Sequence, residues 1–164
     1  MAKEIERKFL VKDESFKSLA TEKHEICQAY LSTRPEATVR VRVLDSEAYI
    51  TVKGRNSGAV RREWEYAIPV DDALEMLGQC VEQGTVAIEK TRYIVPEGDS
   101  GLRWEVDEFR GAHAGLVVAE IELPDEGYAL GTLPGFIGRE VTGDARYYNS
   151  ALASSADTPL SAAD

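Results

Sequence analysis

Alternating apolar and polar residues run through most of this 164-residue chain and predict a series of β-strands. In residues 38–44, for example, three valines alternate with Arg40 and Arg42. Successive side chains of a strand point to opposite faces, so the valines and the arginines lie on different sides of a sheet. The same pattern predicts eight strands, at residues 4–11, 25–32, 38–44, 48–53, 61–68, 86–95, 102–109 and 117–123.

Helical patterns are fewer and fall between or after the strands. Residues 13–20 combine an acidic start with apolar residues at helical spacing, which predicts a short helix. A longer helix is expected after Pro69, where Asp71 and Asp72 precede a stripe of apolar residues. A terminal helix is expected at residues 144–153.

Short turns rather than helices join most of the strands, which is typical of an antiparallel α+β fold. The segment at residues 124–138 is rich in glycine and proline and is expected to be a loop. No repeat and no linker divides the chain. We expect one domain over residues 1–153 and a disordered tail over residues 154–164.

Charged residues gather on one face of the predicted strands, usually in pairs of one sign. The basic members are Lys8, Arg40, Arg42, Lys53, Lys90 and Arg92. The acidic members are Glu4, Glu6, Glu63, Glu65, Glu105, Asp107, Glu120 and Glu122. An antiparallel sheet with one face in water alternates in a similar way. Pairs of one sign and long arginines favour an anion site instead, because arginine binds phosphate oxygens through two parallel hydrogen bonds.

Amphipathic helices must cover apolar sheet surface, which would turn the charged faces inward. The fold predicted here is therefore an eight-stranded antiparallel β-barrel with a charged interior and with helices packed outside. Its cations can neutralise a polyanion, whereas grouped carboxylates stay ionised together only around a positive charge. Oxygen ligands without histidine or cysteine favour Mg²⁺ or Mn²⁺. A polyphosphate bound with such a metal satisfies both groups of side chains.

Composition narrows the alternatives. The net charge of −10 argues against a nucleic-acid partner held by bulk charge. Cys27 and Cys80 have no metal-ligand spacing, and His24 and His113 have no catalytic partner pattern. A charged strand begins at Glu4 and no apolar run approaches the length of a membrane span, so we expect a cytoplasmic protein without a membrane partner. The sequence is compatible with a homodimer and does not fix the oligomeric state.

Several short motifs together resemble those of the CYTH superfamily, the triphosphate tunnel metalloenzymes. These motifs are Glu4-Ile5-Glu6-Arg7-Lys8, Gln28-Ala29-Tyr30-Leu31, Val39-Arg40-Val41-Arg42, Thr51-Val52-Lys53-Gly54, Glu63-Trp64-Glu65-Tyr66, Glu89-Lys90-Thr91-Arg92-Tyr93, Trp104-Glu105-Val106-Asp107 and Ala119-Glu120-Ile121-Glu122-Leu123. Each motif is weak alone, but the set is specific and covers residues 4–123. Two further segments, at residues 142–144 and 147–149, extend the match to the predicted terminal helix.

The resemblance implies a tunnel that binds a triphosphate group together with a divalent metal, Mg²⁺ or Mn²⁺. Matching positions imply that Lys8, Arg40, Arg42, Lys53, Lys90 and Arg92 bind the phosphates. Glu4, Glu6, Glu120 and Glu122 would hold the metal, with Asp107 as a helper. Glu63 and Glu65, together with Lys90, are the candidate catalytic residues, and the two glutamates would orient a water. Tyr30 matches a substrate-binding position, although a strand tyrosine serves packing as often.

Among the activities of this superfamily, we expect hydrolysis of inorganic triphosphate to diphosphate and phosphate, with water as the nucleophile. The small domain and the absence of an evident base-reading insertion resemble the short bacterial triphosphatases. A class IV adenylate cyclase, in which the 3′-hydroxyl of ATP replaces water, is the main alternative. Thiamine or nucleoside triphosphatase activity and a non-catalytic polyphosphate-binding module also remain open. The terminal helix could close one mouth of the tunnel, with Tyr147 or Tyr148 inward, or pack on the outside.

Overall fold

The computed structural model describes residues 5–55 and 62–159. This part of the chain forms one antiparallel sheet in which the strand order is β5-β4-β3-β2-β6-β7-β8-β1-β9. The strands are β1 Glu6–Val11, β2 Glu22–Arg34, β3 Ala37–Leu44, β4 Glu47–Gly54, β5 Glu63–Ile68, β6 Ile88–Pro96, β7 Arg103–Arg110, β8 Val117–Glu122 and β9 Ile137–Glu140. The helices are α1 Phe16–Leu19, α2 Val70–Gln79 and α3 Asn149–Ala153, with 3₁₀ turns η1 Gly111–His113 and η2 Ala145–Tyr147.

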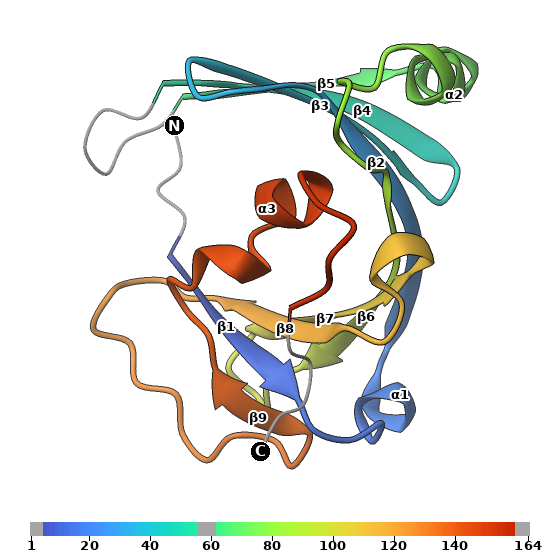
Figure 1. The fold of residues 1–164 in the computed structure, drawn as a ribbon. Coiled ribbons are helices and arrows are strands. Elements are labelled where there is room, and N and C mark those ends of the chain that lie inside the picture. The colour runs from blue at the N-terminus through green and yellow to red at the C-terminus, as the bar shows by residue number, and fades with distance from the viewer. Residues whose placement is uncertain (1–4, 56–61, 160–164) are drawn as a thin grey trace.

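All eight predicted strands are present, and each of these eight begins and ends within a few residues of the prediction in the described ranges. The predicted first residues of two of them, Glu4 and Arg61, lie outside the described residues. The barrel prediction is right only in part, because β5 and β9 lie at the two ends of the order and the sheet is not closed between them in the described residues. The sheet nevertheless curves strongly, so that it has a concave and a convex side (Figure 1). The ninth strand, β9, lies in the segment that was expected to be a loop.

The short strand β9 pairs with β1, where Phe9 faces Glu140 and Val11 faces Ile137. Its four residues include a glycine and are too few to establish an alternating pattern, so the sequence does not reveal it. Long-range contacts fix it in place. Arg7 donates to both carboxylate oxygens of Glu140, at 2.8 and 2.7 Å.

The convex face of the sheet carries the main apolar core. Phe9, Trp104 and Phe136 pack there edge to face, with Phe9 and Trp104 ring centroids 5.5 Å apart. Phe16 places α1 against this cluster. A smaller cluster joins Ala73 of α2 to Val41 and Ala48 of the β3–β4 hairpin, which places α2 outside the sheet as predicted. In the alternating strands, the apolar side chains therefore face the convex side, and the charged side chains face the concave side.

The C-terminal segment departs from the prediction. A single helix over residues 144–153 was expected, but Tyr148 has an extended backbone (φ −70°, ψ 141°) and divides the segment into η2 and α3. Figure 1 shows α3 inside the curve of the sheet rather than outside it. Tyr147 and Leu152 are buried there against Leu10, Phe109 and Val118 from the concave face. The expectation that all helices pack outside is therefore wrong for α3.

The described chain continues beyond residue 153, where the predicted domain ends, and Thr158 contacts the rest of the protein. The buried His113 contacts Thr158 through Nδ1 at 3.0 Å and the carbonyl oxygen of Leu152 through Nε2 at 2.6 Å. Residues 160–164, the rest of the predicted tail, lie outside the described residues. No helix in the described ranges is both long and apolar enough to cross a membrane.

Candidate active site

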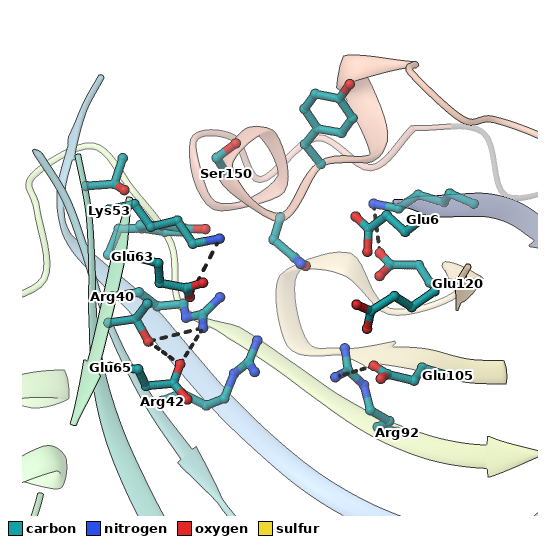
Figure 2. Close-up of a pocket in the computed structure, with 17 residues that line it drawn as sticks. Glu6, Arg40, Arg42, Lys53, Glu63, Glu65, Arg92, Glu105, Glu120 and Ser150 are labelled. Carbon is teal, nitrogen blue, oxygen red and sulfur yellow. Dashed lines mark hydrogen bonds and ion pairs between the residues drawn. The ribbon is translucent and has the colours of Figure 1, made fainter. Parts of the chain in front are cut away.

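A cavity of about 510 Å³ occupies the concave side of the sheet. The charged inner faces of β1, β3, β4, β5, β6, β7 and β8 line it, and residues 148–150 border it from the C-terminal segment. Figure 2 shows cations and carboxylates pointing into this space from two facing walls. The predicted site residues among its lining are Glu6, Lys8, Tyr30, Arg40, Arg42, Lys53, Glu63, Glu65, Arg92, Glu120 and Glu122.

Strands β3, β4 and β5 form the first wall. Thr51 donates to Glu65 at 2.8 Å and accepts from Arg40 at 3.3 Å, so a hydroxyl lies between the two charges. The direct Arg40–Glu65 separation is 3.8 Å, and that between Lys53 and Glu63 is 3.9 Å. These ion pairs are long and partly exposed, and such pairs contribute little to stability. Their charges therefore remain available to a ligand in the cavity.

Arg42 lies deeper on the same wall. Its Nε donates to Oε1 of Gln28 on the adjacent strand β2 at 2.7 Å. Burial, together with the nearby cations Arg40 and Arg92, lowers the pKa of Arg42 to about 10. A bound anion would counter both effects, so this position favours an anionic ligand.

The facing wall consists of β1 and β8 and carries Glu6, Glu120 and Glu122, three of the six carboxylates among the described residues that line the cavity. Their register places Glu6 opposite Glu122 and Lys8 opposite Glu120. The Lys8 ammonium lies 2.9 Å from Glu120 and donates to the carbonyl oxygen of Tyr147 at 3.0 Å. The described part of this wall thus presents three carboxylates and one cation, and this cation contacts both Glu120 and the C-terminal segment.

Beneath the cavity, Asp107 is buried between two cations. Lys90 lies 2.8 Å from one carboxylate oxygen, and Arg92 donates to both oxygens at 2.7 and 2.9 Å. Burial acts to raise the pKa of Asp107, but Lys90 and Arg92 outweigh it and hold that pKa well below its usual range. Burial is also the main reason why the pKa of Lys90 is lowered. Neither Lys90 nor Asp107 lines the cavity, and both lie buried below its surface.

The donor set suits a hard divalent cation. Glu6, Glu120 and Glu122 supply carboxylate oxygens on one wall, and these side chains border the same cavity. Among the described residues, no three histidine, cysteine, aspartate or glutamate side chains already converge into a metal cage. Glu120 is paired with Lys8 instead. Glu4, the fourth predicted ligand, lies outside the described residues.

Comparison with known proteins identifies the family. Residues 2–132, most of the chain, match the model of the CYTH domain. The chain belongs to the CYTH family. This confirms the resemblance seen in the sequence motifs. In the described residues, the strands of the sheet carry most of these motifs.

Two curated relatives match the CYTH protein over nearly all of its length. One is an inorganic triphosphatase of Acetivibrio thermocellus, 50% identical over 153 residues that cover 93% of this chain and 94% of the relative. Another is an inorganic triphosphatase of Nitrosomonas europaea, 38% identical over 152 residues that cover 92% and 96%.

Solved structures share the fold. A crystal structure of an inorganic triphosphatase matches with a TM-score of 0.71 and 33% identity, covering 94% of this chain and 97% of the other. A Pyrococcus horikoshii protein matches with a TM-score of 0.55 and 21% identity, covering 75% and 79%. At that identity the second likeness concerns the fold alone.

The structure of the CYTH protein adds cavity residues that were not among the predicted site residues. Glu105 borders the cavity and lies 2.6 Å from Arg92, and its position two residues before Asp107 was the available signal. Tyr148, Asn149 and Ser150 border it too, and Asn149 accepts from Lys90 at 3.4 Å. Inward placement of Tyr148 had been one of two alternatives. Only long-range packing reveals that Asn149 contacts the buried lysine.

Proposed function

We propose that this CYTH protein hydrolyses inorganic triphosphate to diphosphate and phosphate. The observation that carries the proposal is that cations from four strands and carboxylates from both walls line the same cavity. Phosphoryl transfer depends mainly on positioning and on neutralising charge, which is what such a cavity offers. The two curated relatives named inorganic triphosphatase, which match over nearly the whole chain, support the same activity.

In this proposal, the cations hold the phosphate oxygens. Arg40, Arg42 and Lys53 bind from the first wall, and Lys8 and Arg92 bind from the opposite side. Arginine can engage two oxygens at once, which fixes orientation as well as charge. Tyr30 borders the same cavity. Lys90, which lies below the surface, adds positive charge and steadies Asn149.

Asp107 acts in our proposal by positioning cations rather than by helping to hold a metal. Its oxygens already accept from Arg92 and Lys90. Such a buried carboxylate keeps two neighbouring cations charged and fixed in direction. The sequence could not separate this role from a metal role, because both require a carboxylate on the inner face.

A divalent metal fits the acidic wall. Glu6, Glu120 and Glu122, together with Glu4, would hold Mg²⁺ or Mn²⁺. When bound, such an ion supplies charge neutralisation at the phosphate oxygens and lowers the pKa of a water. Lys8, which now pairs with Glu120, would then be free to contact a phosphate oxygen.

Glu63 and Glu65 are proposed to orient the attacking water and accept its proton. Both border the cavity from β5, and their pairings with Lys53 and Arg40 are loose enough to be exchanged. A carboxylate within hydrogen-bond reach of a water is the usual arrangement for general base catalysis.

A comparison of substrates tests the proposed activity. The protein is incubated with Mg²⁺ or Mn²⁺ and with inorganic triphosphate, ATP or thiamine triphosphate, and phosphate, diphosphate and cyclic AMP are measured. We expect the highest kcat/KM with inorganic triphosphate. Cyclic AMP as the main product from ATP would show a class IV adenylate cyclase. No turnover of any substrate with either metal would favour a binding module.

A further inference from the structure

A buried amide, Gln28, is the direct partner of Arg42 across the β2–β3 pair. The two residues are in register, and Oε1 of Gln28 accepts from Nε of Arg42 at 2.7 Å. A guanidinium can only donate, so the amide must turn its oxygen toward it. The Gln28 side chain has no solvent exposure, and its contact with Arg42 is therefore shielded from water.

This partner is unlike those of Lys8, Lys90 and Arg92. Lys8 pairs with Glu120 at 2.9 Å, and Lys90 and Arg92 pair with Asp107 at 2.8 and 2.7 Å. Within the described ranges, by contrast, Arg42 forms no ion pair with a carboxylate within 4.0 Å. Its partner is a neutral oxygen.

A neutral partner leaves Arg42 without a paired carboxylate, and Asp107 and Glu65 attract it only from a greater distance. Burial of an unpaired charge is unfavourable, and Arg40 and Arg92 add repulsion. Gln28 fixes the direction of the guanidinium without cancelling this charge. A carboxylate at the same place would fix it equally well but would compete with any anion.

The same strand pair holds hydrogen-bond donors in excess. In the described part of the chain, Nε2 of Gln28 and Nε of Arg40 are the buried side-chain polar atoms without a partner. The two atoms belong to neighbouring residue pairs of the β2–β3 register, Gln28 with Arg42 and Tyr30 with Arg40. Unsatisfied buried donors destabilise a protein until an acceptor arrives. Arg40 lines the cavity, so a phosphate oxygen, which is an acceptor only, could accept from its Nε, whereas Gln28 has no solvent exposure and lies outside the lining.

We propose that Gln28 is a positioning residue for triphosphate binding, which orients Arg42 and preserves its full charge for a phosphate oxygen. This inference rests on the proposed function. It concerns a residue that the cavity lining does not include and that acts through Arg42.

Two substitutions of similar shape separate this role from plain packing. Gln28→Glu keeps the hydrogen bond to Arg42 and adds a competing negative charge, whereas Gln28→Met removes the acceptor and adds no charge. We expect Gln28→Glu to raise the KM for inorganic triphosphate about tenfold or more, and Gln28→Met to raise it about threefold. Gln79→Glu makes the same chemical change on the exposed side of α2 and is expected to leave KM unchanged.

A merely structural Gln28 would reverse this order, because Glu would retain the hydrogen bond and Met would lose it. A KM for Gln28→Glu within about twofold of wild type, or below that of Gln28→Met, overturns the proposal. Thermal unfolding checks that each variant is folded. If Gln28→Glu does not fold, Gln28→Met decides, since an unchanged KM for it also overturns the proposal.

The wild-type protein separates the two proposals. If it does not hydrolyse inorganic triphosphate, the proposed function fails, and the same ranking is read from direct binding of inorganic triphosphate by calorimetry. Binding in the order wild type, Gln28→Met, Gln28→Glu supports the role of Gln28. Equal affinities, or no binding by wild type, overturn it.

Discussion

At the scale of single residues, Asp107 organises the charges beneath the cavity. It is buried, and its contacts with Lys90 and Arg92 are all 2.9 Å or shorter. Removing one member of such a group leaves the others charged, buried and without compensation. The two cations depend on Asp107 for their state as well as for their direction.

We therefore expect Asp107→Asn to lower the free energy of unfolding by about 3–5 kcal/mol, as measured by urea denaturation at pH 7. Glu108→Gln is a matched control, because Glu108 follows directly and pairs at 2.9 Å with Lys17 at a partly exposed site. That change should lower the free energy of unfolding by about 1 kcal/mol or less. Equal losses for the two variants would contradict the role given to Asp107.

The same carboxylate gives stability a specific dependence on pH. The pKa of Asp107 is below 3.8 in the folded protein, so the unfolded chain binds more protons around that pH. Stability from this group is thus present above about pH 4 and is lost as pH falls through the folded pKa. The difference in unfolding free energy between wild type and Asp107→Asn should narrow below about pH 4, and a constant difference down to pH 3 would argue against it.

At the scale of elements, the inner face of several strands changes from charged to apolar along its length. In β1 the order is Glu6, Lys8, Leu10, and in β7 it is Glu105, Asp107, Phe109. The charged positions border or underlie the cavity, while Leu10 and Phe109 pack on the C-terminal segment. The segment that carries α3 thus covers the apolar part of the concave side and leaves the charged part open.

Leu152→Ala should lower the free energy of unfolding by about 2–5 kcal/mol, because Leu152 is fully buried against this apolar layer. Leu74→Ala, on the exposed side of α2, should change it by about 0.5 kcal/mol or less. Chemical denaturation of both variants provides the measurement. A loss at Leu152 as small as that at Leu74 would mean that α3 is not packed inside the sheet.

Local patterns predict the elements better than their arrangement. The eight alternating strands were predictable because each holds enough residues to show a period of two. The strand β9 was not, since its four residues show no pattern and its place is set by β1. The inner position of α3 stayed one of two alternatives for a similar reason, because Leu10 and Phe109 lie far from it in sequence.

The candidate site shows the same limit. Inner-face charges such as Arg40 and Glu120 were predictable from alternation, and the structure places both at one cavity. Their pairings were not, since Asp107 contacts Lys90 and Arg92 only through the register of β6 and β7.

At the scale of the whole molecule, the net charge does not describe how charges are placed. The net charge is −10, yet among the described residues five cations from four strands line one cavity beside six carboxylates. The negative total disfavours general binding to polyanions, while a divalent cation held by the carboxylates would leave the cavity cations to a small anion. A homodimer stays a prediction, and light scattering of the purified protein measures it directly.

The central claim is that this cavity cleaves inorganic triphosphate with water. Phosphorus NMR of inorganic triphosphate, incubated with the protein and Mg²⁺, follows every phosphorus atom of the substrate and products. Diphosphate and phosphate should appear together in equal molar amounts as triphosphate disappears, and at a greatly reduced rate with Arg42→Ala. Persistence of the triphosphate signals with the wild-type protein, with Mg²⁺ and then with Mn²⁺, would contradict the account.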